Sequence, residues 1–186
     1  MKNFDEIKLA KELIKFPTIK TEDKGIMRFL SKKLSSIGFR CKIIKSKGLD
    51  SKIALNLFAK YGNSKPHINY LGHTDVVLNL RNWSVPPFKG IVRKGYLIGR
   101  GAQDMKGGIA CWISAVSKFI NNNKFKGSIS IIIAADEETS GLGTPAVMKY
   151  LRNKKEKIDF CLVGEPTNPK KLGEMIKIGR RGSITG

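Results

Sequence analysis

The stretch SISIIIAADEETSG, residues 128–141, joins an isoleucine-rich run to a cluster of acidic residues. Its first half, residues 128–134, combines isoleucine with small side chains and carries no charge, a pattern typical of a strand buried on both faces. Such a strand needs helices on both sides of its sheet, because both faces must be shielded from water. The stretch therefore predicts an α/β fold in which Glu137 and Glu138 follow an inner strand.

Helical and extended patterns alternate on either side of this stretch. Apolar residues at helical spacing predict helices at residues 4–16, 25–37, 107–121 and 144–151. Further strands are predicted at residues 39–45, 53–60, 67–71, 90–98 and 158–163, and another begins at 174–177. We expect the first two of these to pair across a turn at 48–50, and residues 158–163 to be buried. The alternation predicts a mostly parallel sheet that helices cover on both sides.

The bulk composition excludes several classes of protein. A chain of 186 residues is long enough for one sizeable core, and its hydrophobic content of 41% is ordinary for a globular domain. No apolar run reaches the length of a membrane span, and residues 1–16 lack the apolar centre of a secretory signal. The scattered Cys41, Cys111 and Cys161 favour neither a disulfide framework nor a thiolate zinc site. We therefore expect a cytoplasmic protein that has no membrane partner.

The formal net charge of +20 would suit a nucleic-acid partner. Lysine supplies most of the 35 basic residues, however, and it is spread over every segment of the chain. No RNA-binding aromatic motif, helix-turn-helix signal or block of basic and aromatic residues is present in the sequence. We therefore expect no nucleic-acid partner, and we interpret the charge as one that attracts a small anionic substrate.

Four turns that follow predicted strands each carry an acid or a histidine. They contain His73 in GHTD, Asp104 in GRGAQDMKGG, Glu137 and Glu138 in ADEETSG, and Glu165 in GEPT. Each has an ordinary alternative, namely a structural histidine, a helix N-cap, a solvated acidic loop or a loop acid. One divalent cation accounts for all four turns at once, and histidine with carboxylates suits Zn²⁺ or a similar ion. The sequence therefore favours a metal site at the carboxyl ends of neighbouring strands.

Six motifs in order carry a family resemblance: LGHTDVV, WSVPPF, GRGAQDMKGG, ADEETSG, VGEPT and GRRGS. They resemble the bacterial succinyl-diaminopimelate desuccinylases, a group within the dinuclear zinc aminoacylase/carboxypeptidase family, over about the first half of such an enzyme. The resemblance implies a hydrolase that removes succinate from N-succinyl-diaminopimelate in lysine and diaminopimelate biosynthesis. Acetylornithine deacetylases, related aminoacylases and carboxypeptidases, and a non-catalytic metal-binding fragment are the alternatives.

The resemblance also implies roles for the residues in these turns. The implied zinc ligands are His73, Asp104, Glu138 and Glu165, with Asp104 bridging two ions. Glu137 would be the general base, and Asp75 would orient His73 through its second ring nitrogen. The complete enzyme would hold two zinc ions, with cobalt as a possible replacement.

The last residues of the chain are expected to contact the substrate. Arg180, Arg181 and Ser183 in GRRGS would bind its anionic groups, because arginine forms paired hydrogen bonds with carboxylates. We interpret residues 1–178 as an incomplete catalytic domain of the zinc-peptidase type, and residues 179–186 as the start of a connection to a lid domain that makes the complete enzyme a homodimer. The chain has one other histidine, His67, which we place at a strand start or on the surface. Because the second ion then lacks a histidine, we expect the 186-residue chain alone to be inactive.

Overall fold

The computed structural model describes residues 3–48, 51–78, 82–168 and 170–179. Its helices are α1 (Glu6–Ile14), α2 (Ile26–Ser35), α3 (Gly107–Asn122) and α4 (Gly143–Asn153), with a short π-helical turn at Ala102–Lys106. Its strands are β1 (Arg40–Lys47), β2 (Ile53–Gly62), β3 (His67–His73), β4 (Ile91–Arg93), β5 (Tyr96–Ile98), β6 (Ser128–Ala134) and β7 (Phe160–Val163). The four predicted helices are confirmed. None of the helices that the structure describes combines the length and hydrophobicity that a membrane span requires.

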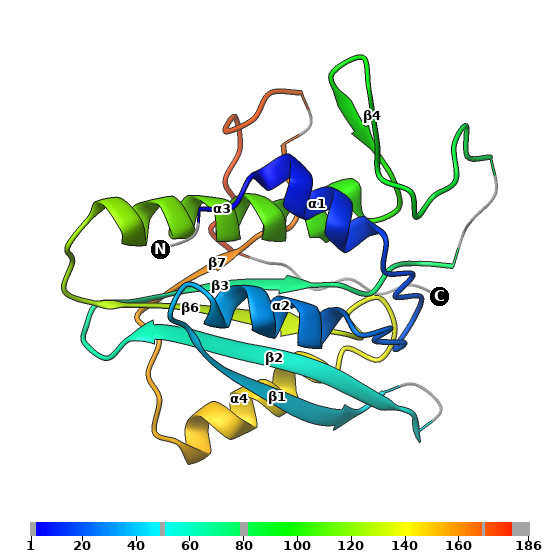
Figure 1. Ribbon diagram of the computed structural model, residues 1–186. Helices are drawn as coiled ribbons and strands as arrows, with labels where there is room; N and C mark the ends of the chain where they lie inside the picture. Colours follow the sequence, from blue (N-terminus) through cyan, green and yellow to red (C-terminus); the bar gives the residue numbers. More distant parts are fainter. Residues whose placement is uncertain (1–2, 49–50, 79–81, 169, 180–186) are drawn as a thin grey trace.

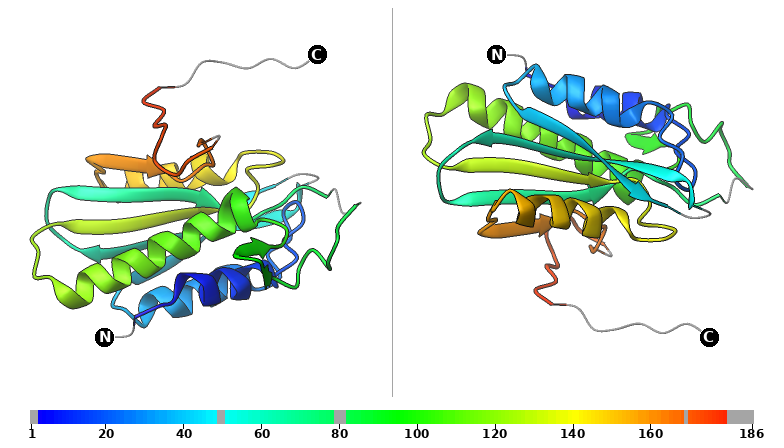
Figure 2. Two further views of the ribbon diagram at one scale, coloured as in Figure 1. Left: turned by 90° about the horizontal axis from the view of Figure 1, so that it is seen from above. Right: turned by 90° about the horizontal axis from the view of Figure 1, so that it is seen from below.

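Five strands form one sheet in the order β1-β2-β6-β3-β7. Helices α1, α2 and α3 lie on one side of this sheet and α4 lies on the other (Figures 1 and 2). The predicted α/β class is therefore confirmed, and so is the antiparallel pairing of β1 with β2. The described sheet is mixed, because β2 also pairs antiparallel with β6, whereas β3 runs parallel to both β6 and β7.

Strand β6 is the inner strand that its sequence predicts, and all of its residues are buried. Ile131 and Ile133 point into the larger core beneath α1, α2 and α3, while Ile132 points into the smaller core beneath α4. This alternation follows from the two-residue repeat of a strand. Each buried isoleucine side chain stabilises the fold by about 1.5–3 kcal/mol relative to an exposed one.

Parallel pairing collects the functional turns at one edge of the sheet. His73 pairs with Ala134, so the end of β3 lies beside the start of the ADEETSG turn. Strand β7 pairs with β3 as far as Leu71 and Val163, which places the VGEPT turn at the same edge. The carboxyl ends of parallel strands are where an α/β sheet binds its ligands.

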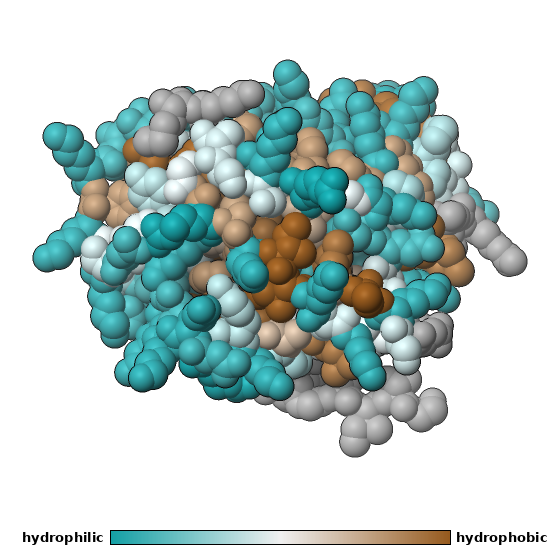
Figure 3. Space-filling model, turned by 60° about the horizontal axis from the view of Figure 1, so that its bottom comes forward, coloured by the Kyte–Doolittle hydropathy of each residue, from teal (hydrophilic) through white to brown (hydrophobic). Residues whose placement is uncertain are grey.

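The prediction that residues 158–163 are buried is wrong. Phe160, Leu162 and Val163 in β7 are 64%, 53% and 51% exposed. The reason is that β7 lies at the edge of the described sheet, and α4 packs on β1, β2 and β6 instead. On the face turned forward in Figure 3, hydrophobic side chains gather in a patch among hydrophilic ones.

Two other strand predictions are also wrong. Residues 90–98 form a hairpin of β4 and β5, because Lys94 and Gly95 adopt positive φ angles of 50° and 81° and turn the chain back. Two consecutive positive φ values are the geometry of a tight hairpin turn, and glycine at the second position accommodates it. Residues 174–177 form no strand, and Ile176 is largely exposed with no neighbouring strand in the described sheet.

His67 begins β3, as predicted, but the alternative of a surface position is wrong because its side chain is buried. Its Nδ1 lies 2.8 Å from the carbonyl oxygen of Lys157, and its Nε2 lies 2.7 Å from the hydroxyl of Ser130. Both ring nitrogens therefore have polar neighbours within the protein, which accounts for the burial of this histidine.

The exposed strand β7 leads to a prediction about association. Replacing Phe160 and Leu162 together with lysine should lower self-association of the chain, because charged side chains on an edge strand oppose pairing with another chain. Light scattering at rising concentration measures the effect, and the free energy of unfolding should change by less than about 1 kcal/mol because both residues are exposed. Ile7→Lys together with Tyr96→Lys is the control, since both are exposed apolar residues outside the sheet edge. An equal effect of the control pair would contradict a specific role of β7.

Candidate metal centre

His73 is the central residue of the candidate site. It ends β3 and is buried, with its Nδ1 atom 3.1 Å from the carbonyl oxygen of Asp75 and 3.5 Å from Oδ1 of the same residue. A neutral imidazole that donates from Nδ1 keeps the lone pair of Nε2 free for a cation. Nε2 is the atom that faces the other acidic residues.

Asp75 joins the end of β3 to the turn after β6. Its Oδ1 atom accepts a hydrogen bond of 3.1 Å from the backbone N–H of Glu137, and its Oδ2 atom accepts one of 2.8 Å from that of Glu138. The side chain is buried, so these backbone donors offset the cost of removing its charge from water. Asp75 thereby places the imidazole of His73, through its backbone carbonyl and its carboxylate, and the two consecutive glutamates, through the carboxylate.

Three carboxylates surround Nε2 of His73. Oδ1 of Asp104 lies 2.9 Å from it, Oε1 of Glu165 lies 3.8 Å from it, and Oε2 of Glu137 lies 3.9 Å from it. Two sets of residues could each hold a metal ion, because the ligand atoms within each set all lie within 4.8 Å of one another. One set is His73 with Asp104 and Glu138, and the other is His73 with Glu137 and Glu165. The structure thus brings all four turns together, although Glu137, the predicted base, lies in the same set as Glu165, a predicted ligand.

The Asp104 carboxylate provides a test of whether a cation fits this cluster. When His73 is neutral and donates from Nδ1, the buried Oδ1 atom of Asp104 forms no hydrogen bond with any described residue, although Nε2 of His73 lies 2.9 Å away. A buried oxygen without a donor is costly, and a bound cation removes that cost. Imidazole and carboxylates are also the donor set that a divalent ion such as Zn²⁺ accepts. The residues present therefore fit a divalent metal ion.

The charges of the cluster shift several pKa values. Burial acts to lower the pKa of His73, but the hydrogen bond and charge of Asp75, with two further carboxylates nearby, raise it to about 9. Burial raises the pKa of Glu138, and the charge of Asp104 raises it further. Burial also raises the pKa of Glu165. A divalent cation acts in the opposite direction, because it favours ionised carboxylates and a neutral imidazole.

Two buried charged residues that sequence reasoning did not single out support the turns. Asp136 is fully buried; its Oδ1 accepts from the N–H of Gly143 at 2.8 Å, and its Oδ2 accepts from that of Leu142 at 3.2 Å. Lys106 is also fully buried and donates to the carbonyl oxygen of Phe16 at 2.8 Å. Burial lowers the pKa of Lys106 to about 7. Asp136 could have been found from the sequence, because three consecutive acids follow a buried strand and the first continues its alternation.

The predicted substrate-binding residues Arg180, Arg181 and Ser183 lie outside the described residues. The same holds for most of the predicted connection at 179–186, of which the structure describes residue 179. Their roles remain predictions.

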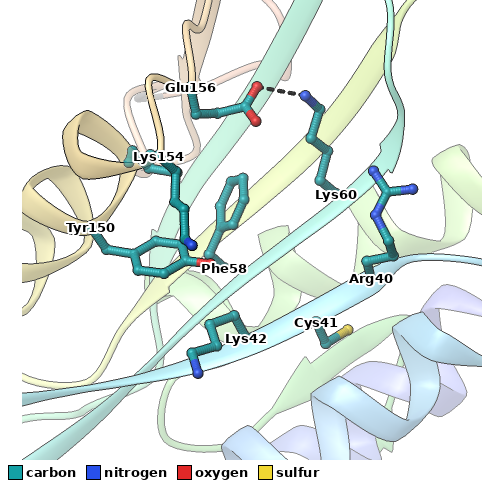
Figure 4. Close-up of a pocket in the computed structure, with 9 residues that line it drawn as sticks. Arg40, Cys41, Lys42, Phe58, Lys60, Tyr150, Lys154 and Glu156 are labelled. Carbon is teal, nitrogen blue, oxygen red and sulfur yellow. Dashed lines mark hydrogen bonds and ion pairs between the residues drawn. The ribbon is translucent and has the colours of Figure 1, made fainter.

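Figure 4 shows a separate hollow of about 430 Å³. It lies toward the other end of the sheet from His73, because Lys60 pairs with Ser130 at the start of β6, whereas His73 pairs with Ala134 at its end. Its lining residues come from β1, β2, α4 and the turn after α4: Arg40, Cys41, Lys42, Phe58, Lys60, Tyr150, Leu151, Lys154 and Glu156. Lys60 forms an ion pair with Glu156, and Arg40 donates to the carbonyl oxygen of Gly62 and to the side chain of Asn63. Two of the four cations are therefore already engaged, and no lining residue belongs to either possible metal-ligand set.

Comparison with known proteins adds a family and relatives. Residues 70–180 match the model of peptidase family M20/M25/M40. The succinyl-diaminopimelate desuccinylase of Pelagibacter ubique (strain HTCC1062) is 55% identical over 188 aligned positions, which cover 99% of this chain and 49% of that protein. The protein of the same name from Ehrlichia canis (strain Jake) is 47% identical over 97% of this chain and 48% of its own length. The chain thus spans about half the length of the curated relatives it matches.

Solved structures show the same fold at lower identity. Human carnosine dipeptidase 1 superposes with a TM-score of 0.73 and 21% identity, covering 85% of this chain and 37% of its own. The dipeptidase Dug1p from Saccharomyces cerevisiae gives a TM-score of 0.72, with the same identity and coverage. These likenesses establish the architecture of the fold.

The raised pKa values predict how the stability of the metal-free chain depends on pH. The pKa of His73 rises from 6.5 to about 9 on folding, so protonated His73 stabilises the fold below pH 6.5 and this stabilisation is lost as the pH rises through 9. The loss should be on the order of 3 kcal/mol. The lowered pKa of Lys106 adds stability over part of the same pH range, so the quantity to compare is the difference in melting temperature between the wild type and His73→Gln, measured with a chelator present. A difference that does not change between pH 6.5 and 9 would contradict the arrangement of charges around His73.

Proposed function

The chain belongs to peptidase family M20/M25/M40, and on that basis we propose that the complete protein is a succinyl-diaminopimelate desuccinylase. It would hydrolyse the amide bond of N-succinyl-diaminopimelate and release succinate and diaminopimelate, within lysine and diaminopimelate biosynthesis. The observation that carries this proposal is the 55% identity to a protein of that name over 99% of this chain. The basic character of the chain suits a substrate that carries several carboxylates.

For the metal centre we propose zinc, with cobalt as a replacement. The proposed ligands are His73, Asp104, Glu138 and Glu165, and Asp104 would be shared by the two ions of the complete enzyme. The orphaned Oδ1 atom of Asp104 and its distance of 2.9 Å from Nε2 of His73 support this assignment. When bound, the metal supplies a water molecule whose pKa lies near neutrality and polarises the substrate carbonyl.

The protein's own residues then act on the proton and the substrate. Glu137 accepts a proton from the attacking water and later returns it to the nitrogen of the leaving amine. Its side chain is half-exposed and its Oε2 atom lies 3.9 Å from Nε2 of His73, so it faces the cluster while remaining open to a substrate. Asp75 holds the imidazole of His73 in one orientation, and its bonds to the backbone of Glu137 keep the base beside the ligands.

The remaining assignments concern the complete protein. We propose that residues 1–178 belong to its catalytic domain, and that residues 179–186 begin the connection to a lid domain through which it forms a homodimer. Arg180, Arg181 and Ser183 would bind the carboxylates of the substrate. The enzyme would work in the cytoplasm, without a nucleic-acid or membrane partner. The 186-residue chain alone would hold one ion and show negligible hydrolysis.

The choice of substrate can be measured on the complete protein. N-succinyl-diaminopimelate should be turned over at least about 100-fold more efficiently than acetylornithine, because unpaired polar groups in a binding site penalise a substrate that lacks their partner. The measurement is kcat/KM for each amide with zinc present. Turnover of acetylornithine alone would exclude the desuccinylase and leave a deacetylase.

The two adjacent glutamates provide a matched pair of variants. Glu137→Gln in the complete protein should lower kcat by about 10²–10⁴-fold, the usual contribution of a general base, while the metal content stays near normal. Glu138→Gln should instead lower the metal content, because it removes a proposed ligand. Metal analysis and kcat are measured on the same preparations. Loss of metal in the Glu137 variant with full metal in the Glu138 variant would reverse the two assignments.

A further inference from the structure

Tyr70, in the middle of β3, touches three glycines with its ring. It is 3% exposed. A Cβ atom added to Gly72 would lie 3.1 Å from its Cε1 atom, and one added to Gly108 would lie 2.9 Å from its hydroxyl oxygen. A Cβ added to Gly164 would overlap the phenol itself. The phenol of Tyr70 therefore fills the space that side chains at these three positions would need.

Two of these glycines stand next to a proposed metal ligand in the sequence, and the third follows another proposed ligand by four residues. Gly72 precedes His73, and Gly164 precedes Glu165. Gly108 lies in the first turn of α3, which begins directly after the turn that contains Asp104. The ring of Tyr70 is thus in contact with three of the four ligand-bearing segments, although it belongs to none of the four turns.

The hydroxyl of Tyr70 is unusual for a buried phenol. It forms no hydrogen bond with any described residue, and burial is the main cause that raises its pKa above the ordinary value. A buried hydroxyl without a partner costs about 1–3 kcal/mol. Phenylalanine would fill the same core without this cost, so stability alone does not account for the oxygen.

The ring has little freedom to move away from the glycines. Trp112, on α3, packs against it with ring centroids 5.4 Å apart and planes tilted by 35°. Met105 and Ile109 approach Gly72 beside it, since a Cβ on that glycine would lie 3.2 and 3.4 Å from their side chains. The hydroxyl oxygen is therefore held between Gly108 and Gly164.

We propose that Tyr70 is a positioning residue whose ring and hydroxyl set the separation between the start of α3 and the turn after β7. This separation places carboxylate oxygens of Asp104 and Glu165 within 2.9 and 3.8 Å of Nε2 of His73. The inference rests on the proposed metal site, whose geometry it explains. Removing the oxygen leaves a gap between the two segments, and a ligand shift of a few tenths of an ångström weakens a metal site.

The first test compares Tyr70→Phe with the wild-type chain by titration with Co²⁺. The wild type should bind one ion, and the variant should bind it about 10-fold more weakly with an altered visible absorption spectrum, at the lower end of the range that loss of a supporting residue causes. The melting temperature of the metal-free variant should stay equal or rise, because an unpaired hydroxyl has been removed. Tyr61→Phe is the matched control, a half-buried tyrosine that stacks on Phe125 in the core. Equal affinity and an unchanged spectrum for Tyr70→Phe would overturn the inference.

A second test probes the separation between the start of α3 and the turn after β7 and needs no bound metal. Gly108→Ala adds a methyl group that meets the hydroxyl of Tyr70 at 2.9 Å, with the carbonyl oxygen of Gly164 next at 3.4 Å. It should lower the melting temperature although alanine favours helices over glycine, and Tyr70→Phe in the same chain should restore it. Additive effects of the two substitutions would overturn the spacer role. A wild-type chain that binds no Co²⁺ would count against the proposed metal site, and the double variant would still decide the spacing.

Discussion

The candidate site depends on the hydrogen bonds that the buried carboxylate of Asp75 accepts. This carboxylate accepts backbone hydrogen bonds from Glu137 and Glu138 while it faces Nδ1 of His73. A single side chain therefore links the end of β3 to the turn after β6, and it lies on the Nδ1 side of the imidazole. The backbone donors offset the desolvation of its charge. The remaining carboxylates face the other ring nitrogen, Nε2. The arrangement of the site follows from these two roles: Nδ1 contacts Asp75, and Nε2 is directed at the other carboxylates.

Several acids around one histidine form a charge cluster that protons and cations compete for. In the metal-free chain, protons are held more tightly by His73, Glu138 and Glu165 than in water, as their raised pKa values indicate. A divalent cation relieves the repulsion without protonation, which is why a donor set so rich in carboxylates suits a metal better than a structural role. The buried amine of Lys106 lies close enough to Asp75 for that charge to favour its protonated form, but burial has the larger effect and lowers its pKa to about 7, and its hydrogen-bond acceptor is a neutral carbonyl.

The sequence predicted what depends on local periodicity and missed what depends on neighbours. Strand β6 and the four helices follow from apolar spacing, and parallel pairing then brings the predicted turns to one edge of the sheet. The exposure of Phe160 could not be predicted, because an apolar run reads the same at the edge of a sheet as in its centre. The hairpin at Lys94 was missed because lysine seldom adopts a positive φ angle, so the turn carried a weak signal. The burial of His67 depends on Ser130 and on a carbonyl group distant in sequence, which no local pattern shows.

The glycines of the motifs have the same kind of explanation. Read alone, Gly72 and Gly164 suggest tight turns, yet neither adopts a positive φ angle. Their lack of a side chain is required by space, because the phenol of Tyr70 occupies the volume where a Cβ would lie. A site assembled from separate turns needs a common reference that fixes their distances, and packed side chains provide one because protein interiors resist compression. A buried residue that carries no charge and binds no metal can therefore determine how well its neighbours do.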